Sequence, residues 1–252
     1  MTRYRLDIEY DGRPFQGWQR QADVPSVQQV LEQAAAELDD APVTAHTAGR
    51  TDTGVHALGQ VAHIDLQIAR PADKLADALN YHMRPNPVAI LRAEEVDESF
   101  HARFSATARY YRYTIINRRA DLTVDKGLAW RVAQPLDAES MNAGAQHLTG
   151  HHDFTTFRDS QCQARSPMRT LDTITVERVG ERVEITCSAR AFLHRQVRSM
   201  VGSLVEVGRG RREPAWIGDI LAAAERAACG PVAPPDGLYL TGVDYGPRPS
   251  AD

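Results

Sequence analysis

Apolar and charged residues alternate at the start of the chain. From Arg3 to Tyr10 every second side chain is apolar, and the side chains between them are charged. A period of two is the pattern of a half-buried β-strand. A break containing Gly and Pro follows, and apolar residues then recur with helical spacing from Val27 to Leu38. Ser26, with Gln29 three residues later, has the pattern of a capping box, so the sequence predicts that a helix begins there.

The rest of the first half continues this alternation of strands and helices. Apolar runs at 60–66 and 88–96 predict two more strands. Pro71 suits the first turn of a second helix, which we expect to extend to about Tyr81. The order of elements in the first half is therefore β-α-β-α-β.

The second half has a related order, although it contains more turns. The segment 151–154, which follows a predicted helix, is interpreted as a loop with local hydrogen bonds. The predicted elements are a strand at 107–116, a helix at 137–148 with Gly150 at its C-cap, a hairpin turning at Gly180, helices at 192–207 and 214–228, and a last strand in "GLYLTGVDY".

This order predicts the fold class. Two α+β halves, each with a mainly antiparallel sheet, follow from strands and helices in this arrangement. The best division lies between residues 102 and 106, although no linker rich in Pro, Gly or Ser marks it. We therefore expect an N-terminal domain at 1–104 and a C-terminal domain at 105–252.

Composition and charge narrow the class of protein. The chain has 252 residues, 42% of them hydrophobic, and a net charge of −4, which is ordinary for a globular protein. The negative sum argues weakly against a nucleic-acid partner, but arginines gather at 101–119 and 190–212. Two interpretations are compatible with such arginine-rich tracts in a protein of negative net charge. The first is a face that binds a polyanion, and the second is arginines scattered over the solvated surface. Either tract alone favours the second interpretation.

The cysteines and the N-terminus predict the compartment. Cys162, Cys187 and Cys229 are widely spaced and form no C-x-x-C pair, so neither a structural zinc site nor a disulfide framework is indicated. The amphipathic pattern starts at once, and no apolar run approaches the length of a membrane span. We therefore expect a reduced, cytoplasmic protein without a membrane segment.

The stretch "AGRTDTGVHALGQ", residues 48–60, contains the main candidate for chemistry. Its D-T-G tripeptide also occurs in aspartic proteases, but those enzymes need two aspartates that share a proton. This chain has one such tripeptide, and Arg50 close to Asp52 would favour the ionised carboxylate. An ionised aspartate suits a nucleophile at a sugar carbon. A turn-capping role for Asp52 is, from this loop alone, about equally compatible with the sequence.

Two other stretches bear on function. "FHARFSATARYYRY", residues 100–113, interleaves Arg with aromatics, so that Arg109, Tyr111 and Tyr113 share one face of a strand. Such a strand can stack on an unpaired base, with guanidinium groups on phosphate, or place an aromatic face in the core. His147, His151 and His152 do not complete a known metal-ligand spacing, and no nucleotide-binding glycine motif is present.

The chain resembles the TruA-type tRNA pseudouridine synthases almost from end to end. The stretches that carry this resemblance keep the family's order and approximate spacing. They are "YDGRPFQGWQRQ", "SVQQVLE", "GRTDTGVHALGQVAH", "FHARFSATARYYRY", "GHHDFTTFR", "QCQARSPMRT", "AFLHRQVRSMVGSL" and "GLYL". Thr53 and Gln196 stand where alanine and methionine are common in the family, and neither change removes a chemical group.

The resemblance implies roles for individual residues. Asp52 matches the family's catalytic aspartate, and Arg50 the arginine that helps to flip the target uridine out. Tyr111 matches the tyrosine that stacks on the base, and Arg198 the basic residue that pairs with the carboxylate. The tRNA-contacting positions are Arg70, the segment Phe100, His101, Ala102, Arg103 and Phe104, and the segment Gln161, Cys162, Gln163, Ala164 and Arg165.

The resemblance also implies an architecture and an activity. It implies two RRM-like (ferredoxin-like) α/β domains with the active cleft between them, and a cytoplasmic homodimer that uses no cofactor and no catalytic metal. The implied reaction is the isomerisation of uridine to pseudouridine at positions 38, 39 and 40 of the tRNA anticodon stem-loop. The alternative is a non-catalytic RNA-binding or chaperone module on the same fold.

Overall fold

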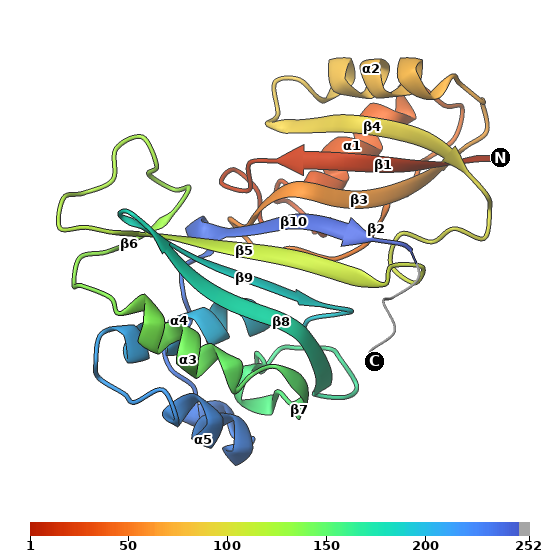
Figure 1. Cartoon of the computed structure of the whole chain (residues 1–252). Coiled ribbons are helices and arrows are strands. Elements are labelled where there is room, and N and C mark those ends of the chain that lie inside the picture. Colours follow the sequence, from red (N-terminus) through yellow and green to blue (C-terminus); the bar gives the residue numbers. More distant parts are fainter. Residues whose placement is uncertain (247–252) are drawn as a thin grey trace. The chain divides into compact units, whose positions relative to one another are not determined.

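The computed structural model describes residues 1–246, and Figure 1 shows the elements. These residues contain ten β-strands and five α-helices, which belong to two compact units. Unit 1 comprises Met1–Arg109 together with the C-terminal segment from Tyr239, and unit 2 comprises Tyr110–Leu238. Most strand pairs within the units are antiparallel, which confirms the predicted α+β class.

Unit 1 is built on the alternating strand at the start of the chain. Its elements are β1 (Thr2–Tyr10), α1 (Val27–Ala36), β2 (His46–Thr47), β3 (His56–Leu66), α2 (Ala72–Met83), β4 (Val88–Val96) and β10 (Leu238–Asp244). The order of strands is β4-β1-β3-β10, and β2 pairs with β3. The side chains of Tyr4, Leu6, Ile8 and Tyr10 are all buried, so the period-two prediction is confirmed. The Ser26 hydroxyl accepts the Gln29 N–H at 3.3 Å, which confirms the predicted helix start.

Unit 2 contains the remaining strands and three helices. Its sheet has the order β5-β9-β8-β7, β6 pairs in parallel with β5, and α3 packs on β8 with α4 beside α3 (Figure 1). Its elements are β5 (Ala108–Asn117), β6 (Trp130–Val132), α3 (Ala138–Gln146), β7 (Gly150–Asp153), β8 (Met168–Val179), β9 (Arg182–Ala189), α4 (Gln196–Gly208) and α5 (Trp216–Ala223), with short 3-10 turns at Thr155–Phe157, Arg226–Ala228 and Pro235–Gly237.

The units divide the chain differently from the predicted domains 1–104 and 105–252. The boundary lies after Arg109, and the last strand belongs with the N-terminal residues. Tyr239 and Leu240 of β10 pair in parallel with His56 and Ala57 of β3. Pairing between residues so far apart in the chain leaves no local signal in the sequence.

Three predictions for unit 2 are wrong in detail. The segment 151–154 was predicted to be a loop, but Gly150–Asp153 is strand β7, because its backbone pairs with Met168–Leu171 of β8. Gly150 is accordingly the first residue of a strand, with φ of 109°, and the α3 C-cap is His147. The last helix ends at Ala223, because Ala224 adopts a left-handed conformation with φ of 49°.

The helix predicted at 192–207 begins later than expected. It starts at Gln196, directly after Arg195, whose φ of 59° is left-handed. The residues before it are held elsewhere: the His194 carbonyl accepts the Asp159 N–H at 3.1 Å, and the Arg195 guanidinium donates to the Asp159 carboxylate at 3.0 Å. These contacts and the left-handed Arg195 keep the end of "AFLHR" out of the helix, so the helix begins only at Gln196.

Candidate active site

Hydrogen bonds on both sides of Asp52 fix the loop that joins β2 to β3. The Thr51 carbonyl accepts the Trp18 N–H at 3.1 Å, and the Thr51 hydroxyl lies 2.8 Å from the Tyr10 hydroxyl. The Val55 N–H donates to the Asp52 carbonyl at 3.1 Å, which closes a turn. Asp52 itself is half-buried. The core of unit 1 therefore sets the position of the Asp52 backbone.

Two glycines of "DGRPFQGW" allow this segment to lie directly against the Asp52 loop. A Cβ on Gly12 would stand 2.1 Å from the Val55 carbonyl oxygen. A Cβ on Gly17, whose φ is +88°, would stand 2.5 Å from the Thr51 carbonyl oxygen. Both distances are far below van der Waals contact, so only glycine fits at these two positions.

Arg109 links the start of this loop to the segment 100–104. Its guanidinium Nη2 donates to the Ala48 carbonyl at 2.7 Å and to the Arg103 carbonyl at 2.8 Å. The side chain is only 7% exposed. For Arg109, the idea that strand arginines hold phosphate is therefore wrong, because this guanidinium joins two backbone segments inside unit 1.

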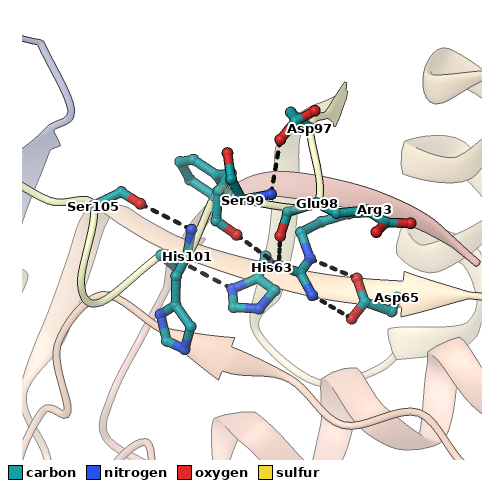
Figure 2. A network of polar contacts seen from close by, with 10 residues as sticks. Arg3, His63, Asp65, Asp97, Glu98, Ser99, His101 and Ser105 are labelled. Carbon is teal, nitrogen blue, oxygen red and sulfur yellow. Dashed lines mark hydrogen bonds and ion pairs between the residues drawn. The ribbon is translucent and has the colours of Figure 1, made fainter.

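The segment 97–105 is fastened to the strands of unit 1 by a polar network (Figure 2). The His63 Nδ1 accepts the Ala102 N–H at 3.1 Å. The Arg3 guanidinium donates to the carbonyls of Glu98 and Phe100, the latter at 2.9 Å, and forms an ion pair with Asp65 at 2.7 Å. This network fixes the backbone between the end of β4 and the start of β5.

The ring of His63 lies in a cluster of three histidines. The His46 ring stacks on it with 4.9 Å between centroids, and the His101 ring meets it edge-on at 4.7 Å. Burial lowers the pKa of His63 to about 4, and the charge of Arg3 and the two neighbouring imidazoles act in the same direction, while Asp65 opposes them. His63 is therefore neutral near neutral pH, as an Nδ1 acceptor must be.

The depressed pKa of His63 predicts a pH dependence of stability. Because the unfolded chain binds a proton near pH 6.5 and the folded chain only near pH 4, protonation favours unfolding between these values. We expect the free energy of unfolding of the wild type to fall relative to that of His63→Asn from pH 6.5 to 4, by at most about 1.4 kcal/mol per pH unit. Urea unfolding at several pH values measures it, and equal slopes in the two proteins would contradict it.

The other predicted residues of unit 1 differ in exposure. Arg50, two residues before Asp52, is exposed. Arg103 and Phe104 are exposed too, with the Arg103 guanidinium carbon 5.6 Å from the centroid of the Phe104 ring. Arg70 is half-buried, and its guanidinium donates to the Leu38 carbonyl at 2.8 Å. Arg70 thus also anchors the residues that follow α1.

Unit 2 contributes Tyr111 and Arg198. The Tyr111 ring is half-buried and meets the Phe192 ring edge-on at 5.1 Å, whereas Tyr113 is fully buried. The same face of β5 therefore holds both a core aromatic and a candidate for base stacking. Arg198 lies in the first turn of α4, where its Nε donates to the Ala233 carbonyl at 2.8 Å.

The segment 161–165 is shaped by Asp159. Its carboxylate accepts the Gln161 N–H at 2.9 Å and the Arg195 guanidinium at 3.0 Å. Burial alone would raise the pKa of Asp159, but the Gln161 N–H, Arg195 and His194 outweigh it and lower the pKa. The Arg158 guanidinium also donates to the Cys162 carbonyl at 2.8 Å. Gln161, Gln163 and Arg165 are exposed, whereas Cys162 and Ala164 are half-buried.

The predicted residues are divided between the two units. In unit 1, Arg109 ties the Asp52 loop to segment 100–104, and in unit 2, Tyr111 and Arg198 lie on β5 and α4. Sequence reasoning missed the supporting residues, namely Tyr10, Gly12, Gly17, His63 and Arg109. Only the two glycines left a signal, because a Gly in a tight segment often marks a close backbone approach.

Neither of the two cavities described next, nor a group of metal-binding side chains in the described part of the chain, coincides with the predicted site residues. A cavity of about 460 Å³ in unit 2 is lined by Leu136, Arg209 and Arg212 among others, and one of about 200 Å³ in unit 1 by α1 and residues around His82. Neither is lined by a predicted site residue. Within residues 1–246, no three His, Cys, Asp or Glu side chains are grouped to hold a metal ion. The same part of the chain has no helix long and apolar enough to cross a membrane.

Comparisons with known proteins agree with the resemblance of the sequence. A family model described as tRNA pseudouridine synthase matches residues 8–105 and 145–246, which include Asp52 and Arg198 but not Tyr111. A tRNA pseudouridine synthase A of Maricaulis maris is 63% identical over 245 residues, which is 97% of this chain and 98% of the relative.

Two further relatives have the same printed name, tRNA pseudouridine synthase A. The protein of Hyphomonas neptunium is 62% identical over 97% of this chain and 99% of its own length. That of Rhodopseudomonas palustris is 59% identical over 97% of this chain and 100% of its own length. Identity at this level over nearly the full length leads to one conclusion. The chain belongs to the tRNA pseudouridine synthase family and is an isomerase.

Proposed function

We propose that this chain isomerises uridine to pseudouridine at positions 38, 39 and 40 of the tRNA anticodon stem-loop, with Asp52 as the nucleophile. The observation that carries the proposal is the Asp52 loop. Two glycines and the hydrogen bonds of Thr51 hold the backbone of a half-buried aspartate in place within a protein of this family. Nucleophilic catalysis requires a fixed carboxylate, because a small displacement is costly in rate.

The reaction rearranges bonds within one nucleotide. The bond between uracil N1 and the sugar C1′ breaks, a bond between uracil C5 and C1′ forms, the C5 proton is released and N1 gains a proton. Asp52 adds to C1′ or to the uracil while the base turns, and leaves when C5 joins the sugar. Since the product is an isomer of the substrate, the reaction consumes no oxidant, reductant or phosphate donor.

The remaining predicted residues have supporting roles in this proposal. The target base must leave the stack, and Arg50 occupies the space that it vacates. Tyr111 stacks on the base and takes the C5 proton, and Arg198 pairs with Asp52 and keeps it ionised. Arg70 and the segments 100–104 and 161–165 contact the tRNA, through backbone phosphates where arginines are available. The exposure of Arg103, Phe104 and Arg165 supports such contacts.

The proposal also covers the substrate, the oligomeric state, the compartment and the cofactors of the enzyme. The names of the relatives support tRNA as the substrate. We propose that the protein acts as a homodimer in the cytoplasm, where tRNA is modified, and that it needs no cofactor and no catalytic metal. Sedimentation of the purified chain tests the dimer.

Release of tritium from tRNA labelled at uridine C5 tests the activity. We expect wild-type protein to release tritium from tRNAs with uridine at positions 38–40, and no tritium when these uridines are replaced by cytidine. Release that persists after the replacement would show that other uridines are modified. If no tRNA releases tritium in the presence of the protein, the proposed activity is wrong.

The alternative is a non-catalytic RNA-binding or chaperone module. The exposed Phe104 ring, with the guanidinium of Arg103 near it, favours RNA binding as such, because stacking needs no catalysis. RNA binding alone does not account for the close packing and hydrogen bonds that fix the Asp52 loop, since a carboxylate repels RNA phosphate. Binding of tRNA without tritium release would support this alternative.

A further inference from the structure

The turn at 100–105 keeps its shape through bonds within itself. The His101 N–H donates to the Ser105 hydroxyl at 2.9 Å, and the Ser105 N–H donates back to the His101 carbonyl at 2.9 Å. The Arg103 N–H donates to the His101 Nδ1 at 3.1 Å. These bonds define a compact turn, but they do not fix its position on the sheet of unit 1.

Ala102 is the point at which this turn meets the core. It is completely buried, and both of its backbone polar groups are engaged. Its N–H donates to the His63 Nδ1 at 3.1 Å, and its carbonyl accepts the Tyr245 hydroxyl at 2.8 Å. A buried amide must find a partner, so the acceptor that His63 provides helps to fix where the turn sits, beside the bonds that Arg3 and Arg109 donate to the Phe100 and Arg103 carbonyls.

The residues next to Ala102 are those that face solvent. Phe104 is 70% exposed, and Arg103 lies over its ring. An exposed aromatic ring beside a guanidinium is able to stack on an unpaired base while the charge lies near phosphate. A shift of Ala102 would move both side chains together, because only one residue separates it from Phe104.

The imidazole of His63 is suited to this task. It is 1% exposed, and it points at the segment 97–105 from β3 (Figure 2). Because its Nδ1 accepts a hydrogen bond, the ring is neutral with the proton on Nε2. The neighbouring Arg3 and the two imidazoles disfavour a charge on the ring and so preserve the acceptor.

We propose that His63 is a positioning residue for RNA binding, which acts by holding the Ala102 N–H and thereby presenting Arg103 and Phe104 to the substrate. This role rests on the proposed function, in which segment 100–104 contacts tRNA. His63 does not touch the reacting atoms, so it affects the affinity for tRNA rather than the chemical step.

Two substitutions separate the hydrogen bond from the bulk of the side chain. In His63→Asn the amide oxygen takes a place near that of Nδ1, one bond beyond Cγ, so the acceptor is kept. In His63→Leu the side chain has similar volume but no acceptor, and the Ala102 N–H is left unpaired. His82→Leu is the control, because His82 is an exposed histidine in the last turn of α2.

Single-turnover tritium release at increasing enzyme concentration measures affinity and rate separately. We expect His63→Leu to raise the half-saturating concentration by about tenfold, while the rate at saturation stays within about threefold of wild type. His63→Asn and His82→Leu should stay within about threefold on both measures. Hydrogen exchange should show faster exchange at 97–105 in His63→Leu and unchanged protection in the strands of unit 1.

Several outcomes would overturn this role. Wild-type affinity in a folded His63→Leu would show that His63 only fills the core. Equal weakening by Leu and Asn would show that the ring, not the hydrogen bond, matters. A fall in the saturated rate alone would place His63 in the chemical step. If the wild type releases no tritium from any tRNA, the proposed function fails first, and this result is distinct from the others.

Discussion

The Asp52→Asn variant should bind tRNA with nearly the affinity of the wild type and release almost no tritium from uridine C5. Asparagine has the shape of aspartate, and the backbone bonds of Thr51 and Val55 do not involve the replaced oxygen. The loop should therefore keep its place. The amide is a far weaker nucleophile, so we expect the rate to fall at least about a thousandfold, which corresponds to about 4 kcal/mol of transition-state stabilisation.

A matched variant controls for the loss of a negative charge in unit 1. Asp7 of β1 is also half-buried, and it pairs with Arg5 at 3.0 Å. Asp7→Asn should leave the rate within about twofold of the wild type, since a partly exposed ion pair contributes little. A wild-type rate of tritium release in Asp52→Asn would refute the role of Asp52 as the nucleophile. Tighter tRNA binding without catalysis would still agree with it, because the variant removes a charge that repels phosphate.

The parts of the fold that were predicted correctly are those with local causes. The buried face of β1 follows from its period of two, and the start of α1 follows from the Ser26 hydroxyl. The errors arise where contacts with residues distant in the sequence determine the local structure. Pairing with β8 makes a strand of Gly150–Asp153, and the hold of Asp159 on Arg195 delays the start of α4.

The candidate site divides in the same way. The residues proposed for the chemistry lie in short linear stretches, so resemblance locates them in the sequence. Their supports come from elsewhere in the chain: Arg109 reaches the Ala48 carbonyl, and Tyr10 reaches Thr51. A strand pattern leaves open whether Arg109 binds phosphate, because it does not reveal that this guanidinium is buried against backbone carbonyls.

Gly17 offers the sharpest test of whether this support matters for catalysis. An alanine there meets two costs. Its Cβ would lie 2.5 Å from the Thr51 carbonyl oxygen, and its φ of +88° is unfavourable for any residue with a Cβ. We expect Gly17→Ala to lower the free energy of unfolding by about 2–4 kcal/mol. The displaced loop should move the Asp52 carboxylate and lower the rate at saturating tRNA by about a hundredfold.

Gly180→Ala separates the two costs. Gly180 also has a positive φ, +60°, but nothing lies within 4 Å of a Cβ built on it. Its alanine variant should lose only about 1–2 kcal/mol of stability and keep wild-type activity. Urea unfolding and single-turnover tritium release on the three proteins give both quantities. A carboxylate whose position depends on the contact between Gly17 and Thr51 could not stay in place once a Cβ occupied that space. If Gly17→Ala loses stability but keeps the full rate, this contact therefore stabilises unit 1 without positioning Asp52.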